Sequence, residues 1–116
     1  MEMDLNLEAK KLFQIGKNNE NLIVFAKSAG IMTTLIAIKD YGLKPQKCVF
    51  VGFPSDVLDG WGLNYTPYLQ NLTTPSILFQ NIDDPMGSYQ KTKEISDTYT
   101  DAVTAVAAAK TAANVH

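Results

Sequence analysis

Ser28 stands where its residue type and position could support covalent chemistry. It follows the apolar run of residues 22–26 with one residue between them, and it directly precedes a helical pattern over residues 29–41. A sharp strand-to-helix turn lifts the serine hydroxyl above the sheet, and the unpaired N–H groups of the helix favour an oxyanion nearby. Ala26 and Gly30, two residues to either side, are small, as a close approach of strand and helix requires. This pattern is typical of a nucleophile that attacks a carbonyl carbon.

The same serine has a purely structural interpretation. Serine is a preferred N-cap residue, so Ser28 could cap the helix over residues 29–41 and have no chemical role. The two interpretations differ in backbone geometry, because a nucleophile turn holds its serine in strained φ and ψ angles. The conformation of Ser28 therefore decides between them.

Strand-like and helical patterns alternate along the chain. Short apolar runs predict buried strands over residues 22–26, 48–51 and 76–80. Helical spacing and capping residues predict helices over residues 5–16, 29–41, 66–72 and 88–97. The segment 52–64 contains Gly, Pro and Asp and is predicted to be a loop. Strands that alternate with helices imply right-handed crossovers. The predicted fold class is therefore a three-layer α/β domain with a small parallel sheet of three to four strands and flanking helices.

The segment after Thr98 allows two assignments. It is rich in alanine, which predicts a helix. Residues 102–106 include two valines and a threonine, so a short fourth strand is the alternative.

Composition limits the classes of function. The chain has 116 residues, of which 46% are hydrophobic, which suits one domain over residues 1–116 with its own core. Its net charge of −2 and its scattered lysines give no support for nucleic acid or an anionic membrane as a partner. The longest apolar stretch is too short to span a bilayer. Asp56 and Asp59 share a loop without a histidine, so no metal is expected, and the absence of phosphate-cradling glycine motifs predicts no cofactor.

Cys48 is the only cysteine of the chain. It lies in an apolar run, which favours a buried core thiol over a reactive one. A lone cysteine without a disulfide partner, together with an acidic and polar N-terminus, predicts a reducing, cytoplasmic location.

The strand–AKSAG–helix segment resembles the nucleophile elbow of the α/β-hydrolase fold, whose pattern is G-x-S-x-G. Ala26 takes the place of the first glycine. In that family the acid of the triad follows the strand two places beyond the elbow strand, in a segment similar to G-x-x-D-P. The sequence "NIDDP" of residues 81–85 stands at that place, with Asp84 as the matching acid and Asp83 as the alternative. Aspartates before proline are also ordinary turn residues.

The resemblance implies a catalytic triad and an oxyanion contact. Ser28 would be the nucleophile, Asp84 the acid and His116, the only histidine, the general base, while the N–H of Ala29 would bind the oxyanion. His116 is the last residue, so the alternative is a frayed chain end. No residue of the sequence is expected to supply the second oxyanion donor.

The resemblance covers residues 8–97 and corresponds to the C-terminal half of the fold. Family members have several strands before the elbow, whereas a single predicted helix precedes it here, so the chain is expected to be a truncated or minimised relative. Trp61, Tyr65 and Tyr68 lie where the family places its substrate pocket, and they either line it or pack beneath the loop.

Two functions from different classes follow. The first is a serine hydrolase domain of the esterase, thioesterase or acyl hydrolase type, which acts on a small-molecule ester or acyl substrate. The alternative is a catalytically inactive fragment that serves as a binding or assembly module. Such a module would form a homo-oligomer or pair with another chain through an exposed sheet edge.

Overall fold

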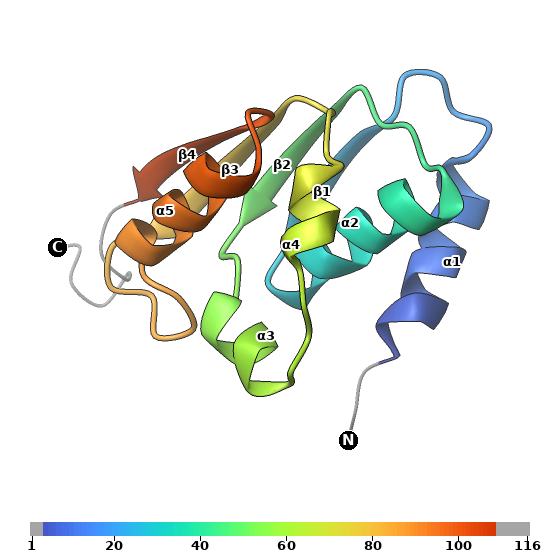
Figure 1. The fold of residues 1–116 in the computed structure, drawn as a ribbon. Coiled ribbons are helices and arrows are strands. Elements are labelled where there is room, and N and C mark those ends of the chain that lie inside the picture. Colours follow the sequence, from blue (N-terminus) through green and yellow to red (C-terminus); the bar gives the residue numbers. More distant parts are fainter. Residues whose placement is uncertain (1–3, 109–116) are drawn as a thin grey trace, which may run out of the picture.

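The computed structural model of the protein describes residues 4–108 (Figure 1). Its centre is a parallel sheet of four strands in the order β1-β2-β3-β4, namely β1 (Ile23–Lys27), β2 (Lys47–Val51), β3 (Ser76–Asn81) and β4 (Val103–Ala108). The helices are α1 (Leu5–Gly16), α2 (Ala29–Tyr41), α3 (Ser55–Gly60), α4 (Thr66–Gln70) and α5 (Tyr89–Tyr99). The predicted α/β class, with a small parallel sheet and flanking helices, is confirmed.

The capping residues explain where the long helices begin and end. The carboxylate of Asp4 accepts a hydrogen bond from the N–H of Leu7 at the start of α1, at 3.0 Å. The hydroxyl of Ser88 accepts one from the N–H of Lys91 at the start of α5, at 3.2 Å. Gly42 ends α2 with a φ of 80°, in the left-handed region that glycine adopts most readily. These boundaries agree with the predictions from the sequence.

Two segments differ from the sequence-based predictions. The preferred helix for the alanine-rich segment is wrong, because β4 pairs with β3 from Ser76 opposite Val103 to Asn81 opposite Ala108. Alanine favours a helix, but here the backbone groups along the edge of β3 are satisfied by pairing with the next strand. The predicted loop over residues 52–64 also contains the short helix α3.

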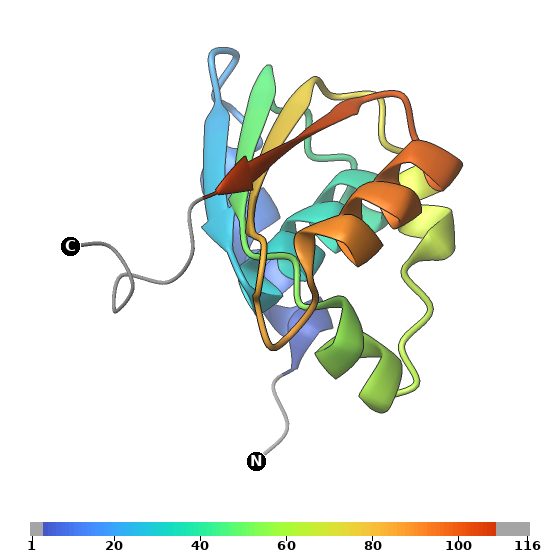
Figure 2. The same ribbon diagram turned by 90° about the vertical axis from the view of Figure 1, so that its left-hand side faces the viewer.

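All the helices of residues 4–108 lie on one face of the sheet (Figures 1 and 2). The strands follow one another across the sheet in sequence order, so right-handed crossovers place each connecting segment on the same side. Val24, Phe50 and Leu78 point from the sheet into this side and are buried. The hydrophobic core therefore lies between the sheet and the helices.

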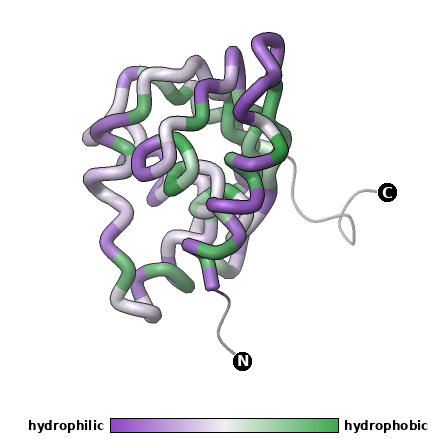
Figure 3. Tube along the Cα trace, turned by 90° about the vertical axis from the view of Figure 1, so that its right-hand side faces the viewer, coloured by the Kyte–Doolittle hydropathy of each residue, from purple (hydrophilic) through white to green (hydrophobic). Residues whose placement is uncertain are grey.

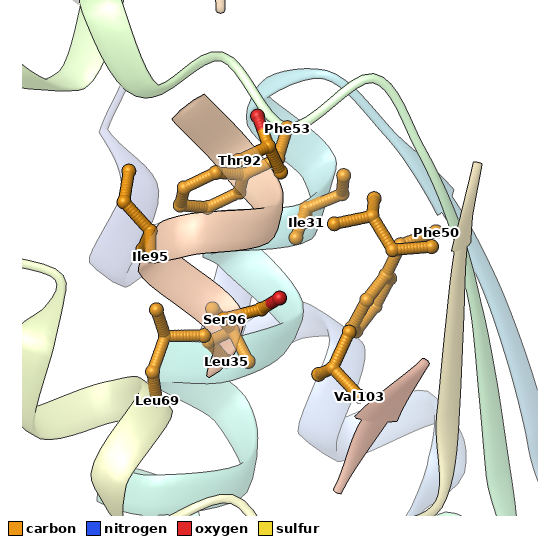
Figure 4. Close-up of a pocket in the computed structure, with 10 residues that line it drawn as sticks. Ile31, Leu35, Phe50, Phe53, Leu69, Thr92, Ile95, Ser96 and Val103 are labelled. Atoms are coloured by element: carbon orange, nitrogen blue, oxygen red, sulfur yellow. The ribbon is translucent and has the colours of Figure 1, made fainter. Parts of the chain in front are cut away.

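A small apolar cavity of about 20 Å³ remains inside this core (Figure 4). It lies between the sheet and helices α2, α4 and α5. The residues that line it are Ile31, Leu35, Phe50, Phe53, Leu69, Leu78, Thr92, Ile95, Ser96 and Val103. The cavity has room for about one water molecule, so the core packs closely and forms a rigid support for the loops above it.

The opposite face of the sheet carries apolar side chains that residues 4–108 leave uncovered. Strand alternation places Ile23 and Phe25 on this face, where they are 58% and 69% exposed. Phe79, exposed, and Val49 and Val51, half-buried, continue the same surface on β2 and β3. In Figure 3 the hydrophobic trace of β1 lies on the outer side of the molecule, below the hydrophilic loop that precedes it. We call this surface the open sheet face; parallel sheets are usually covered on both faces.

We expect Phe50→Ala and Phe25→Ala to differ sharply in their cost to stability. Phe50 is 2% exposed and its removal leaves a cavity, so the free energy of unfolding should fall by about 3–5 kcal/mol. Phe25→Ala on the open sheet face should cost less than about 1 kcal/mol. Urea unfolding of both variants measures the difference. A loss for Phe25→Ala as large as that for Phe50→Ala would show that the face is covered in solution.

Candidate active site

Ser28 occupies the turn between β1 and α2 in a strained backbone conformation. Its φ is 53° and its ψ −132°, and it is the only non-glycine residue with positive φ in residues 4–108. Such angles cost an L-residue about 1–3 kcal/mol, so the surrounding structure must hold them in place. The N–H of Ser28 donates to the carbonyl oxygen of Val51 at 3.0 Å, and its own carbonyl accepts from the N–H of Ile31 at 3.0 Å.

The interpretation of Ser28 as a simple helix cap does not hold. An N-cap residue normally has an extended backbone and a side chain that accepts from the helix, as Ser88 does for Lys91. The side chain of Ser28 makes no capping hydrogen bond, and the residue is exposed. The strained backbone therefore presents a hydroxyl at the surface without using it to stabilise α2.

The residues on either side of Ser28 allow β1 and α2 to approach closely. A Cβ atom at Gly30 would lie 3.8 Å from the Cβ of Ala26, which is ordinary van der Waals contact. The turn thus requires small residues at these positions but does not require glycine, and Ala26 meets the demand. Because α2 begins at Ala29, the N–H groups of Ala29 and Gly30 have no helical acceptor and are available to an oxyanion above the turn.

Asp84 is the carboxylate that the loop after β3 holds in place. Its Oδ1 accepts from the N–H of Met86 at 2.9 Å, and its Oδ2 accepts from Nε2 of Gln80 at 3.4 Å. Asp84 is half-buried, whereas Asp83 is exposed. Of the two aspartates, Asp84 therefore has the fixed orientation that the acid of a triad needs.

Ser28 and Asp84 lie at the carboxyl ends of β1 and β3, with β2 between them. Two strand spacings separate the ends of β1 and β3 by about 10 Å, which is too far for Ser28 and Asp84 to touch. An imidazole ring between their side chains could bond to both. Gly52, which follows β2, has a φ of 74°, and a Cβ there would lie 3.6 Å from Oδ2 of Asp84. The missing side chain leaves the space between the two groups open.

His116 lies outside the described residues. Its part in the predicted triad therefore stays a prediction, as does its alternative as a frayed chain end.

Gln80 is the residue of this region that the sequence analysis missed. Its side chain is 0% exposed and bonds to the loops after β2 and β3. Oε1 accepts from the N–H of Phe53 at 2.8 Å, while Nε2 donates to the carbonyl oxygens of Phe53 and Gly87 and to Asp84. A glutamine at an inward-facing position of an apolar strand was the available signal, because a buried amide requires partners.

Other polar groups at this end of the sheet serve the scaffold. Lys91 of α5 bonds to Asp56 and, at 2.9 Å, to Asp59 of α3. These two carboxylates raise the pKa of Lys91, and the hydrogen bond from Lys91 lowers the pKa of Asp59. The cluster ties α5 to α3. Cys48 is buried, as predicted, and burial raises the pKa of its thiol to about 11, so it is a poor nucleophile.

An open hollow lies between α2 and the segment that joins α3 to α4. Met32, Trp61, Leu63 and Tyr68 are among its lining residues, and Met32 is one turn along α2 from Ser28. Tyr65 is instead buried and packs edge-on against Phe53, with ring centroids 5.2 Å apart. Tyr65 thus packs beneath the loop, whereas a role of Trp61 and Tyr68 in a substrate pocket stays a prediction.

No protein-family model, curated protein or solved structure matches this chain. Within residues 4–108, none of the helices combines the length and apolar character needed to cross a membrane. The case for an α/β-hydrolase site therefore depends on the residues and their geometry.

Substitution of two serines should separate strain from capping. Ser28→Gly removes the penalty of a positive φ, so the free energy of unfolding should rise by about 1 kcal/mol. Ser28→Ala should leave stability nearly unchanged, since no capping bond is lost. Ser88→Ala, the matched control, should cost about 1 kcal/mol because it removes a cap. Thermal and urea unfolding measure all three, and a Ser28→Ala cost equal to that of Ser88→Ala would contradict this account.

Proposed function

We propose that the chain is a serine hydrolase domain of the α/β-hydrolase type, with Ser28 as its nucleophile. The observation that carries the proposal is the strained, exposed Ser28 between a parallel strand and a helix. Asp84, which two hydrogen bonds hold in the loop after β3, supports the proposal. Proteins retain strain of this kind chiefly at functional sites.

The proposed reaction proceeds through an acyl-enzyme. The hydroxyl oxygen of Ser28 attacks the carbonyl carbon of an ester or thioester while its proton passes to the imidazole of His116. The N–H of Ala29 donates to the resulting oxyanion, and the carboxylate of Asp84 orients the imidazolium. The imidazolium returns the proton to the leaving alcohol or thiol. Water then attacks the acyl group on Ser28 by the same route and releases the acid.

The hollow next to α2 is the proposed place for the apolar part of the substrate. Met32, Trp61 and Tyr68 offer an apolar and aromatic lining, and of these Met32 lies one helical turn from Ser28 along α2. A cytoplasmic location belongs to the same proposal, because the single cysteine is a buried free thiol.

A second candidate function, that of an assembly module, is favoured by the open sheet face. Ile23 and Phe25 expose apolar surface on β1, which is also an edge strand of the sheet. Contiguous exposed apolar surface on a domain marks a site for a partner. The module would form a homo-oligomer or pair with another chain along this edge.

Labelling of the intact chain with a fluorophosphonate tests the first proposal. We expect rapid addition of one fluorophosphonate group per chain, detected by intact mass, and complete loss of addition in Ser28→Ala. Loss of the imidazole in His116→Ala should slow labelling by about 10²- to 10⁴-fold. A folded chain that is not labelled, or is labelled equally in Ser28→Ala, would contradict the proposal.

Sedimentation velocity over a range of concentrations tests self-association through the open sheet face. If the module is a homo-oligomer, the wild-type chain should associate and Phe25→Lys should be monomeric, because a buried lysine charge opposes packing. Ile15→Lys is the matched control, since Ile15 is equally apolar and 82% exposed but lies on α1. Association that both variants lose equally would argue against this face.

A further inference from the structure

The side chain of Gln80 connects β3 to the loop after β2 and to the loop after β3. It projects from β3 into the covered face and is fully buried. Phe53 belongs to the loop after β2, and Gly87 and Asp84 belong to the loop after β3. A carboxamide that bonds to all three fixes the position of both loops relative to the strand.

The hydrogen-bond partners determine which way the carboxamide faces. The N–H of Phe53 can only donate, so the group that meets it at 2.8 Å must be the oxygen of Gln80. The carbonyl oxygens of Phe53 and Gly87 can only accept, so they require the nitrogen, at 3.1 and 2.5 Å. Nε2 has two hydrogens for three acceptors, so its longer hydrogen bond to Oδ2 of Asp84, at 3.4 Å, shares a hydrogen with one of these carbonyl oxygens.

The donor acts on the oxygen of Asp84 that lies beside Gly52. Oδ1 is occupied by the N–H of Met86, on the side of its own loop. Oδ2 lies beside Gly52, at the end of the strand between the two candidate groups. Gly52 directly follows Val51, whose carbonyl oxygen accepts from the N–H of Ser28. A hydrogen bond to Oδ2 therefore controls the direction in which the carboxylate presents its free lone pair.

We propose that Gln80 is a positioning residue for Asp84, which it holds by the Nε2–Oδ2 hydrogen bond in the orientation that serves Ser28. The inference rests on the proposed hydrolase function and extends it to a residue outside the triad. Gln80 does not touch the substrate; it acts through Asp84. Because its own amide is fixed by Phe53 and Gly87, the carboxylate is oriented before a substrate arrives.

The test uses Gln80→Glu in the full chain, with fluorophosphonate labelling of Ser28 as the readout. This variant keeps the size and one oxygen of the side chain but replaces the donor that faces Asp84 by an acceptor. The saturating labelling rate should fall roughly 10- to 100-fold, with little change in the reagent concentration that gives half the maximal rate. Leu78→Ala, a buried substitution on the same strand that removes no hydrogen bond to Asp84, is the control for lost stability and should label within about twofold of wild type.

A double-mutant cycle separates positioning from general damage to the fold. In an Asp84→Asn background, Gln80→Glu should lower the labelling rate by less than about twofold, because the group through which it acts is already lost. An equal fold-change in both backgrounds would overturn the inference, as would a fall for Leu78→Ala equal to that for Gln80→Glu. A folded wild-type chain that is not labelled, or is labelled equally in Ser28→Ala, contradicts the hydrolase proposal itself. That outcome differs from those that overturn the role of Gln80, so the two failures can be told apart.

A second measurement leaves Gln80 intact in case its variants do not fold. The side-chain NH₂ signals of Gln80 in an ¹H–¹⁵N spectrum should shift in Asp84→Ala, which removes their carboxylate acceptor. They should stay in place in Asp83→Ala, which alters the neighbouring exposed carboxylate. Signals of Gln80 that do not move in Asp84→Ala would overturn the inference.

Discussion

The buried carboxamide of Gln80 is the interaction on which the arrangement at the carboxyl end of the sheet depends. Helices and strands form most of the core, and the loop after β2 adds the buried side chain of Phe53. An amide buried in an apolar layer is costly unless its donors and acceptor are used. Here they are used by backbone groups of both loops and by Asp84. The requirement to satisfy one buried side chain thus fixes two loops and one carboxylate together.

The strained turn at Ser28 depends on the same rigid support. A residue held at a positive φ reduces the stability of the chain, and it persists only if its neighbours leave no alternative. The hydrogen bond from Ser28 to Val51 attaches the turn to β2, and the small residues Ala26 and Gly30 let α2 begin close to β1. The stable core therefore supports a local conformation that works against stability, as sites of catalysis or binding often require.

The order of the strands links the two candidate functions. Four parallel strands in sequence order place every crossover helix on one side, so residues 4–108 cover one face of the sheet and leave the other open. The same order makes β1 an edge strand, and Ser28 follows β1 directly. A polypeptide that paired with this edge would lie next to Ser28. Assembly and catalysis are thus compatible uses of one surface.

The sequence by itself determined the elements whose signals are local. Asp4, Gly42 and Ser88 mark helix ends because capping involves residues within one turn, and short apolar runs marked β1, β2 and β3 for the same reason. Ser28 was found in the same way, since a serine between such a strand and a helix is a local pattern. The order of these elements also predicted the parallel sheet.

Only the tertiary structure decided the features that depend on contacts between distant residues. The alanine-rich segment forms β4 because the edge of β3 offers backbone partners, which outweighs the helical propensity of alanine. Asp84 rather than Asp83 is held because Gln80 and Met86 reach it. The positive φ of Ser28 and the open sheet face likewise follow from how strands and helices pack together. Propensity and periodicity describe neighbours along the chain, whereas these features depend on which groups meet in space.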